Sequence, residues 1–528
     1  MSRFFKAAAL AVLIAFVAGN ARAGAPAGPI HNITGKLTLD EAVKIALKQN
    51  PNILKALQQI EVTRGQIIEV RAEALPHITL AGDYSQEQHT LLEGGGFSSQ
   101  GQSATSAQAF NGQQLAGLIQ QNIPSATQPQ AQTTGQAIAN TIQQNLASAS
   151  QAQAGAVTTP NDKSWRVTVQ ATQVLYAGGQ VAAAIRIAKF AEDSSYFSLR
   201  DIVDQTIATV REQFYNVLLT RALIKVQEES VKLLEDQLKD QQNRFEAGTV
   251  PRFNVLQAEV ALANQQPQLI SARNNYLIAQ YQIAKSLNLD PGPQGTTTFN
   301  AVGELEVHER PLGLKSAIQL GIERRPFLKV QRLTILIQKE QIKVALAGYK
   351  PQLNANGGYE VRSSSLSHEL DDTVEGWFFG ITGSWNIFDG LATYGKVKSA
   401  RANLESAKVN YDDSVHQIEL EVQQAYANLQ TARETIRSQE KTVEQAREAV
   451  RLATERLAAG AGTQLDVLNA QVQLTTARST VVQARANYNS TLAEFDRVTA
   501  TDTVYAETFD DPLVRGRIPK AIPVEKKR

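Results

Sequence analysis

The chain has 528 residues, a formal net charge of +1, no cysteine and a single methionine. The absence of cysteine excludes disulfides and thiolate chemistry, so stability must come from packing and from association of subunits. The balance of basic and acidic residues argues against a nucleic-acid partner.

The first 23 residues have the pattern of a secretory signal peptide. Arg3 and Lys6 precede an apolar stretch, and Ala21-Arg22-Ala23 matches an A-x-A cleavage signal. The A-x-A signal predicts cleavage before Gly24. The apolar run is too short to span a membrane, which argues against a helix that stays as an anchor. An uncleaved anchor helix is the alternative. Cleavage removes three basic residues and takes the formal charge from +1 to −2.

Two parts of the remaining chain repeat each other at constant offsets. Adding 212 to a position pairs Trp165 with Trp377 and Gly248 with Gly460. The preceding part repeats with an offset of 275, so the first copy holds 63 more residues than the second. This pattern predicts one structural unit used twice, over residues 24–300 and 301–500, followed by a tail over residues 501–528.

Each copy contains segments of helical character. Short opening helices are expected at residues 37–48 and 312–324. Longer helices follow at 51–74 and 326–347, each starting with a proline, which is favoured at a helix start. The longest are expected at 179–246 and 391–458, with returning helices at 252–287 and 464–497. The longest helices carry apolar residues spaced by seven, which predicts helices wound around partners. These residues are Val203, Val210, Val217, Ile224, Val231, Leu238 and Phe245, and then Val415, Val422, Leu429, Ile436, Val443, Val450 and Leu457.

Four segments alternate between apolar and polar residues with the period of a β-strand. We expect strands at 76–85, 165–176, 349–361 and 377–388. Each is near the ~9–11 residues of a tilted membrane strand, although a soluble antiparallel sheet would show the same alternation. Four strands cannot close a barrel, and unpaired edges in hydrocarbon are costly. The pattern therefore predicts that several chains share one barrel, without fixing their number.

The duplicated helix–strand–strand–helix order resembles the TolC family of outer-membrane export channels, over roughly residues 37 to 500. The resemblance rests on two strand-to-helix turns and on the tips of two helical hairpins. The turns contain Gly178, Gly179, Asp389 and Gly390, and the tips contain Gly248, Thr249, Val250, Pro251, Gly460, Ala461, Gly462 and Thr463.

The resemblance implies a mixed α/β membrane protein. Three chains, each with four strands, would form a twelve-stranded β-barrel in outer-membrane lipid, continued by a long periplasmic α-helical barrel. It further implies a passive conduit. An inner-membrane RND, ABC or MFS transporter would supply the energy, and a periplasmic adaptor (membrane fusion) protein would dock on the hairpin tips. Plain turn chemistry accounts for the glycines of the tips equally well.

The resemblance also points to a periplasmic gate. Asp466 falls on the first acidic ring position of the family, Asn469 stands at the second, and Asn254 stands where the family can carry an acid. Three copies of Asp466 would form a like-charge ring that attracts cations. Thr463 and Asp466 also fit a capping box at a helix start, and the two roles are compatible.

Two departures from the family concern the lock between neighbouring hairpins. Leu457 and Gly462 occupy places where some members have a tyrosine and an arginine that hold the hairpins shut. We therefore expect a constriction with weaker polar ties.

The insertion at residues 86–163 should lie at the extracellular mouth. It has no charged residue from Gly94 to Asn161 and is rich in Gln, Ala, Ser, Thr and Gly. This composition predicts disorder or a loose cap. A plug in the lumen and an adhesive surface patch are the alternatives.

No catalytic or metal-binding pattern is present, since the six histidines show no ligand spacing. We therefore expect no enzyme activity, no cofactor and no metal. The leading hypothesis is an export channel, with antibiotics, metals, siderophores and proteins all as candidate cargo. A periplasmic coiled-coil adaptor or a surface scaffold is the alternative, which the long helices alone would suit.

Overall fold

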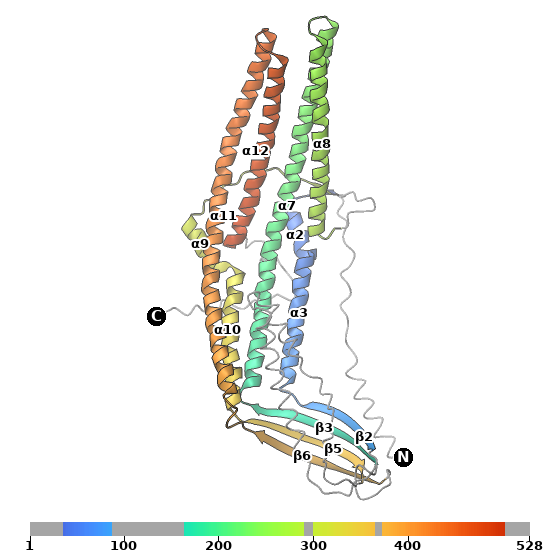
Figure 1. Cartoon of the computed structure of the whole chain (residues 1–528), viewed down its shortest axis with the longest axis vertical. Helices are drawn as coiled ribbons and strands as arrows, with labels where there is room; N and C mark the ends of the chain where they lie inside the picture. The colour runs from blue at the N-terminus through green and yellow to red at the C-terminus, as the bar shows by residue number, and fades with distance from the viewer. Residues whose placement is uncertain (1–34, 87–162, 290–298, 365–371, 502–528) are drawn as a thin grey trace.

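The computed structural model describes residues 35–86, 163–289, 299–364 and 372–501. The expected signal peptide, the insertion apart from its ends, and the C-terminal tail lie outside the described residues. Figure 1 shows an elongated protomer, with a curved four-stranded sheet at one end and the tips of two helical hairpins at the other.

The two halves contain the same order of main elements. The first half comprises β1 (Gly35–Leu37), α2 (Leu39–Gln49), α3 (Pro51–Ala72), β2 (His77–Gln86), β3 (Lys163–Ala177), α7 (Gln180–Glu246) and α8 (Arg252–Ser286). The second comprises β4 (Phe299–Ala301), α9 (Leu314–Arg324), α10 (Pro326–Leu346), the 3₁₀ turn η1 (Ala347–Tyr349), β5 (Gln352–Ser363), β6 (Thr373–Ser384), α11 (Ala392–Ala458) and α12 (Gln464–Thr499).

The long helices α7 and α11 have 67 residues each, about 100 Å at ~1.5 Å per residue. Helix α7 packs against α3 and α8, which follow one another along its length, and also against α10 and α12. Helix α11 packs against α10 and α12. Two shorter helices thus cover each long one, with a break partway along (Figure 1).

Local capping sets where the short helices begin. Thr38 accepts a hydrogen bond from the backbone N–H of Glu41, and the Glu41 carboxylate accepts one from the backbone N–H of Thr38 at 3.0 Å. This reciprocal pair satisfies two free donors at the start of α2. At the next start, Asn50 accepts from the backbone N–H of Asn52 at 2.8 Å, and Pro51 occupies the first helical position.

Several expected boundaries differ from the structure. The opening helices begin at Leu39 and Leu314, because Leu37 belongs to a strand and Thr38 is the helix cap. The strand expected at 349–361 runs from Gln352 to Ser363, because a 3₁₀ turn precedes it.

The last strand needs the largest correction. It was expected at 377–388 and runs from Thr373 to Ser384. Ser384 pairs with Gln352, the first residue of β5, so no backbone partner follows it. The preceding Pro351 has no N–H to donate. The indole of Trp385 instead donates to the carbonyl oxygen of Tyr349 at 3.1 Å.

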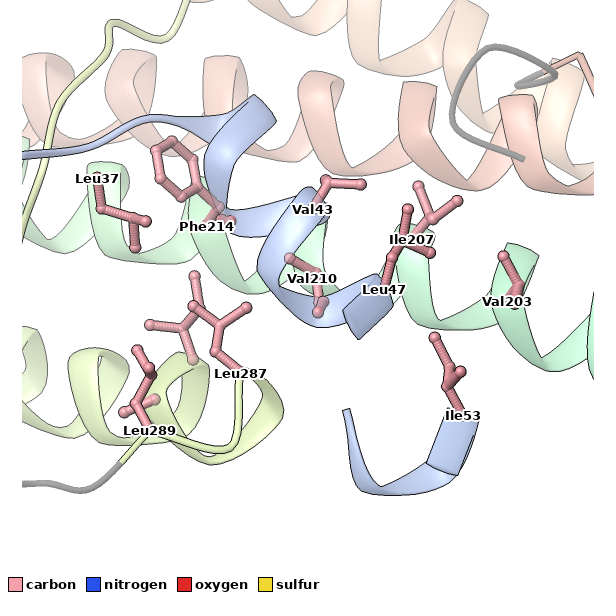
Figure 2. Close-up of a cluster of buried hydrophobic side chains, with 14 of the residues drawn as sticks. Leu37, Val43, Leu47, Ile53, Val203, Ile207, Val210, Phe214, Leu287 and Leu289 are labelled. Carbon is pink, nitrogen blue, oxygen red and sulfur yellow. The ribbon is translucent and has the colours of Figure 1, made fainter. Parts of the chain in front are cut away.

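A small parallel sheet pairs β1 with β4, which the sequence analysis did not anticipate. It brings Leu37 beside Ala301 and lies over the largest hydrophobic cluster of the described residues. Figure 2 shows that cluster, where Val43 and Leu47 of α2 lie beside Ile207 and Val210 of α7. A second cluster joins α9, α11 and α12. Packing at the break between the stacked helices therefore positions both hairpins.

The apolar residues spaced by seven on α7 change their environment along the helix. Val203, Val210 and Val217 are buried within the protomer, whereas Phe245 near the tip is 43% exposed. In the described protomer, the apolar residues spaced by seven therefore form part of the core at mid-height, whereas the last of them, near the tip, is exposed.

The main sheet is antiparallel, with strand order β2-β3-β5-β6. Each neighbouring pair is aligned over most of its length, with one irregularity between Val174 and Tyr176 of β3. Strands β2 and β6 are the edges, and each has one side without a strand partner in the described protomer.

Candidate functional site

One face of the main sheet is apolar and exposed. Strand β6 places Trp377, Phe379 and Ile381 on this face, with exposed fractions of 73%, 82% and 71%. The ring of Tyr359 meets that of Trp377 edge to face, with centroids 5.0 Å apart. Residues directly opposite each other share a face, so Leu80 and other apolar residues of β2 and β3 belong to the same surface.

The opposite face is mostly polar. The guanidinium groups of Arg166 and Arg362 lie 4.0 and 3.6 Å from the carboxylate of Glu360. Thr168 and Asp83 also point to this side, because side chains alternate along a strand. The main sheet is thus apolar on one face and polar on the other.

The strand-to-helix turns use left-handed backbone at matched positions. Gly178 and Gly179 have φ of 62° and 91° before α7, and Gly390 and Leu391 have 64° and 71° before α11. A Cβ at Gly178 would lie 2.8 Å from the carbonyl oxygen of Ala347. Glycine is thus required there, whereas Leu391 adopts a conformation that a branched side chain disfavours.

Asp389 holds the second of these turns. Its carboxylate accepts hydrogen bonds from the hydroxyl and from the backbone N–H of Thr393, the latter at 2.8 Å. These bonds, that from the hydroxyl first, hold the pKa of Asp389 below its usual range.

The first hairpin tip reverses the chain between α7 and α8. Gly248 has φ of 71°, and its N–H donates to the carbonyl oxygen of Phe245 at 2.9 Å. The backbone N–H and the hydroxyl of Thr249 both donate to the carbonyl oxygen of Arg244. Val250 and Pro251 then lead into α8, which starts without a side-chain cap.

The second tip repeats this geometry, and in addition Thr463 caps α12, the helix that follows it. Gly460 has φ of 74°, and the N–H of Ala461 donates to the carbonyl oxygen of Arg456 at 2.8 Å. A Cβ at Gly462 would lie 3.2 Å from Cβ of Arg456 and 3.2 Å from the backbone nitrogen of Leu457. Both tips lie at the end of the protomer remote from the sheet (Figure 1).

Asp466 completes the capping box at the start of α12. Its carboxylate accepts from the backbone N–H of Thr463 at 2.9 Å, and its own N–H donates to the Thr463 hydroxyl at 3.2 Å. The bond from the Thr463 backbone, followed by that from its side chain, keeps the pKa of Asp466 below its usual range. Asp466 and Asn469 are exposed on neighbouring turns of α12, and Asn254 is half-buried on α8. Within the described protomer no hydrogen bond joins Asn254 to Asp466 or Asn469.

The sequence analysis did not anticipate a polar seam between α7 and α12, which joins the two hairpins. Near the tips, Nε2 of Gln241 donates to Oε1 of Gln464 at 3.3 Å, and both side chains are buried. Further along, Thr475 donates to Ser230 at 3.3 Å. Such cross-helix partners are far apart in sequence, so periodicity carries no signal for them.

A second unanticipated feature is a cluster of charged residues at mid-height. The carboxylate of Asp496 on α12 accepts from Arg310 at 3.1 Å and lies 3.6 Å from Arg211 of α7, with only 6% of its side chain exposed. Nearby, Arg325 pairs with Glu421. These pairs join both halves of the chain where the stacked helices meet.

None of the helices in the described residues is long and apolar enough to cross a membrane. No group of His, Asp or Glu in the same residues could hold a metal ion.

Comparison with known families decides what these features belong to. The family described as "Outer membrane efflux protein" matches residues 141–289 and 317–501, which together make up more than half of the chain. The chain belongs to the outer membrane efflux protein family. Family membership places it in the outer membrane, with its helical part in the periplasm, and confirms the resemblance to the TolC family. The family is one of efflux channels rather than enzymes.

Individual relatives are distant. The "Toxin and drug export protein A" of Aggregatibacter actinomycetemcomitans is 23% identical over 207 residues, 38% of this chain and 44% of that protein. The "Outer membrane protein TolC" of Escherichia coli (strain K12) is 27% identical over 113 residues, 21% of this chain and 23% of that protein. The matched segments thus span less than half of either relative.

Solved structures show the same fold over most of the chain. The Campylobacter jejuni CmeC outer membrane channel has a TM-score of 0.64 at 16% identity, covering 87% of this chain and 85% of that one. The outer membrane protein VceC from Vibrio cholerae has a TM-score of 0.64 at 15% identity, covering 87% and 95%.

Proposed function

We propose that this chain is the outer-membrane channel of a tripartite efflux or type I secretion system. It conducts substrates passively from an inner-membrane pump and a periplasmic adaptor to the exterior. The observation that carries the proposal is the four-stranded sheet, with one apolar exposed face, one polar face and two open edges.

An open edge supports assembly. Each protomer leaves β2 and β6 with unpaired backbone groups, and such groups are costly in hydrocarbon. Pairing β6 of one protomer with β2 of the next satisfies these groups and closes a barrel. Three protomers give twelve strands, the number that the family resemblance implies. Two chains would give the eight strands of the smallest barrels, so subunit number is a direct test.

The helices also present a surface for a second protomer. Helix α8 carries exposed apolar side chains whose spacings of three, four, seven and ten residues keep them on one side of the helix. They are Phe253, Leu256, Val260, Ile270, Leu277 and Tyr281. A neighbouring protomer in a helical barrel would cover this stripe, which supports the homotrimer.

The hairpin tips are the proposed docking place for the adaptor, and Asp466 is the proposed gate residue. Left-handed glycines at both tips leave backbone groups open to a partner. The Asp466 carboxylate is exposed and its pKa is lowered, so it carries charge at neutral pH. The pump would be an RND, ABC or MFS transporter.

The test combines location, subunit number and conductance. Full-length protein is expressed with its leader, and outer membranes are separated, extracted with detergent and analysed by native mass spectrometry. We expect a trimer in the outer-membrane fraction that forms ion-conducting pores in planar bilayers. A soluble periplasmic product without conductance would overturn the proposal in favour of a coiled-coil adaptor or scaffold.

A further inference from the structure

Strand β6 places one aromatic side chain on the polar face of the main sheet. Trp377 and Phe379 lie on the apolar face, so the alternation puts Phe378 on the opposite one, together with Thr168 and Glu360. Among the described residues of the four strands, no other Phe, Tyr or Trp lies on that face. A half-buried phenyl ring there is not explained by contact with lipid.

The register explains how this ring is held. Phe378 pairs directly with Gly358 of β5. A Cβ at Gly358 would lie 2.8 Å from Cζ of Phe378 and 3.0 Å from Cα of Gln170, and would collide with the backbone of Val169. The ring therefore leans across the strand and lies over the bare backbone of Gly358. The far end of the ring, Cζ, rests on the wall, and because the residue is only half-buried, the rest of the ring is partly exposed.

The surroundings of the ring leave space on its Gly376 side, whereas on the Gly380 side a Cβ would lie 3.0 Å from Oδ1 of Asn356. Gly376 and Gly380 flank Phe378 on the same strand and the same face, because side chains two residues apart point the same way. A Cβ at Gly376 would meet no atom within 4 Å. Glu360 pairs with Gly376 and provides a polar rim. The result is a phenyl ring beside bare backbone, on a wall that is otherwise polar.

We propose that Phe378 is a specificity-determining residue of the channel, whose exposed ring face stacks with planar aromatic groups of passing solutes above Gly376. The inference rests on the proposed function, because this face becomes a lumen wall only in the closed barrel. Aromatic groups prefer offset stacking or edge contacts with another ring, whereas the surrounding polar wall offers aliphatic solutes no comparable partner. Three copies of the ring would lie at one level of the barrel.

The neighbouring residue provides a matched control. Phe379 lies over Gly357 in the same way, since a Cβ there would lie 2.8 Å from Cδ1 of Phe379. Phe379 is on the apolar face and is 82% exposed. Phe378 and Phe379 thus lie on the same strand, both carry a phenyl ring and each pairs with a glycine of β5. They differ in the face of the sheet on which they lie. Loss of either ring uncovers one glycine, but only Phe378 faces the lumen.

The experiment uses the absence of cysteine in the chain. Gly376→Cys introduces a single thiol beside Phe378, at a position with room for it. The full-length assembly in lipid vesicles is labelled with a water-soluble maleimide, alone or with tryptophanamide as the aromatic probe. Leucinamide, which carries the same charge, is the aliphatic probe. We expect tryptophanamide to slow labelling about two- to tenfold and leucinamide to have little effect.

Second substitutions decide the role of the ring. In the Gly376→Cys background, Phe378→Ala and Phe378→Leu should abolish protection by tryptophanamide, and Phe379→Ala should retain it. Equal labelling rates without probe show that the wall has kept its shape. Protection that survives Phe378→Leu would overturn the inference, because an aliphatic side chain cannot stack.

The same experiment distinguishes failure of the proposed function from failure of the proposed role of Phe378. If the thiol at position 376 does not react from water, this face is not a lumen wall, and the proposed function fails with the inference. If it reacts but tryptophanamide gives no protection, the inference alone is overturned and the channel stands.

Discussion

Gln241 of α7 and Gln464, the first residue of α12, meet through one hydrogen bond of 3.3 Å, from Nε2 of Gln241 to Oε1 of Gln464. Both side chains are buried, yet Oε1 of Gln241 and Nε2 of Gln464 have no partner. A buried unpaired amide atom costs free energy comparable to what one hydrogen bond contributes. The contact between Gln241 and Gln464 near the tips is therefore weak.

Single and double substitutions at this pair should act in opposite directions. Gln464→Leu removes the hydrogen bond of the buried Gln241 amide across the seam and leaves it only the 3.5 Å contact with Asp240, so we expect it to destabilise the seam by about 1–3 kcal/mol. The double variant with Gln241→Leu removes all the unpaired atoms and should be neutral or stabilising. The midpoint of thermal unfolding and the single-channel conductance measure both effects.

The control for these variants is Gln445→Leu, at an exposed position on α11. It changes the same side chain without touching the seam, and it should alter neither quantity. If the double variant is as unstable as the single one, the unpaired amide atoms are not the cause.

The second prediction concerns the cap of α12. The lowered pKa of Asp466 means that its ionised form is favoured in the folded protein. Stability from this group is present above the unfolded value, ~3.9, and is lost as pH falls through the lower folded value. We expect hydrogen exchange at residues 464–468 to rise only below pH ~4 in the native protein, and already at neutral pH in Asp466→Ala. Equal exchange in both proteins at neutral pH would rule out the cap.

The third prediction concerns charge at the same position. If three Asp466 carboxylates form a ring, Asp466→Asn should weaken block of the reconstituted channel by a multivalent cation, on the order of tenfold. Asn254→Asp and Asn469→Asp add carboxylates nearby and should strengthen the block. The measurement is single-channel current against cation concentration. Unchanged block in Asp466→Asn would remove Asp466 from the gate.

Helix ends and helix starts could be predicted from the sequence where the local backbone geometry favours one residue type. Gly248 and Gly460 end the long helices with left-handed backbone, which glycine tolerates. Local capping likewise marked the start of α12 at Thr463. The end of β6 could not be read, because the apolar alternation continues through Trp385 and Ile387 after backbone pairing has stopped. Trp385 and Ile387 are both exposed in the protomer, so their alternation does not report backbone pairing.

Features that depend on distant contacts carried no sequence signal. Strands β1 and β4 have three residues each, too few to show a period. Gln241 and Gln464 are 223 residues apart, and a glutamine on a helix surface is usually solvated. The sequence gives no reason to single out Asp496, and its burial follows only from the meeting of α7 and α12. The gate and docking roles of the tips remain predictions from the resemblance.

The fourth prediction concerns Asp201 on α7, within the charged cluster at mid-height. Burial raises its pKa, and the nearby Arg325 and Arg497 oppose that effect only in part. A carboxyl with a raised folded pKa is destabilising when ionised, so stability falls as pH rises through that value. We expect Asp201→Asn to raise the free energy of unfolding by up to ~1 kcal/mol at pH 7–8. The difference should vanish below pH ~4, where the carboxyl is protonated in both states.

The control for Asp201 is Asp236→Asn, which removes an exposed carboxylate from the same helix. Thermal unfolding across a pH series distinguishes the two variants. A drop in stability for Asp201→Asn at neutral pH would mean that the charges of Arg325 and Arg497 outweigh burial.

The fifth prediction compares two glycines of the sheet. A Cβ at Gly358 would collide with the backbone of Val169 and with the ring of Phe378, whereas a Cβ at Gly376 would meet no atom within 4 Å. Backbone atoms cannot move aside as a flexible side chain can, so Gly358→Ala should destabilise the sheet by about 1–3 kcal/mol. Gly376→Ala should be tolerated, since a strand position with open space gains from the loss of glycine's flexibility. The temperature at which the assembled protein dissociates in detergent measures both. Equal temperatures for the two variants would show that β3 does not approach Gly358 of β5 as closely as described.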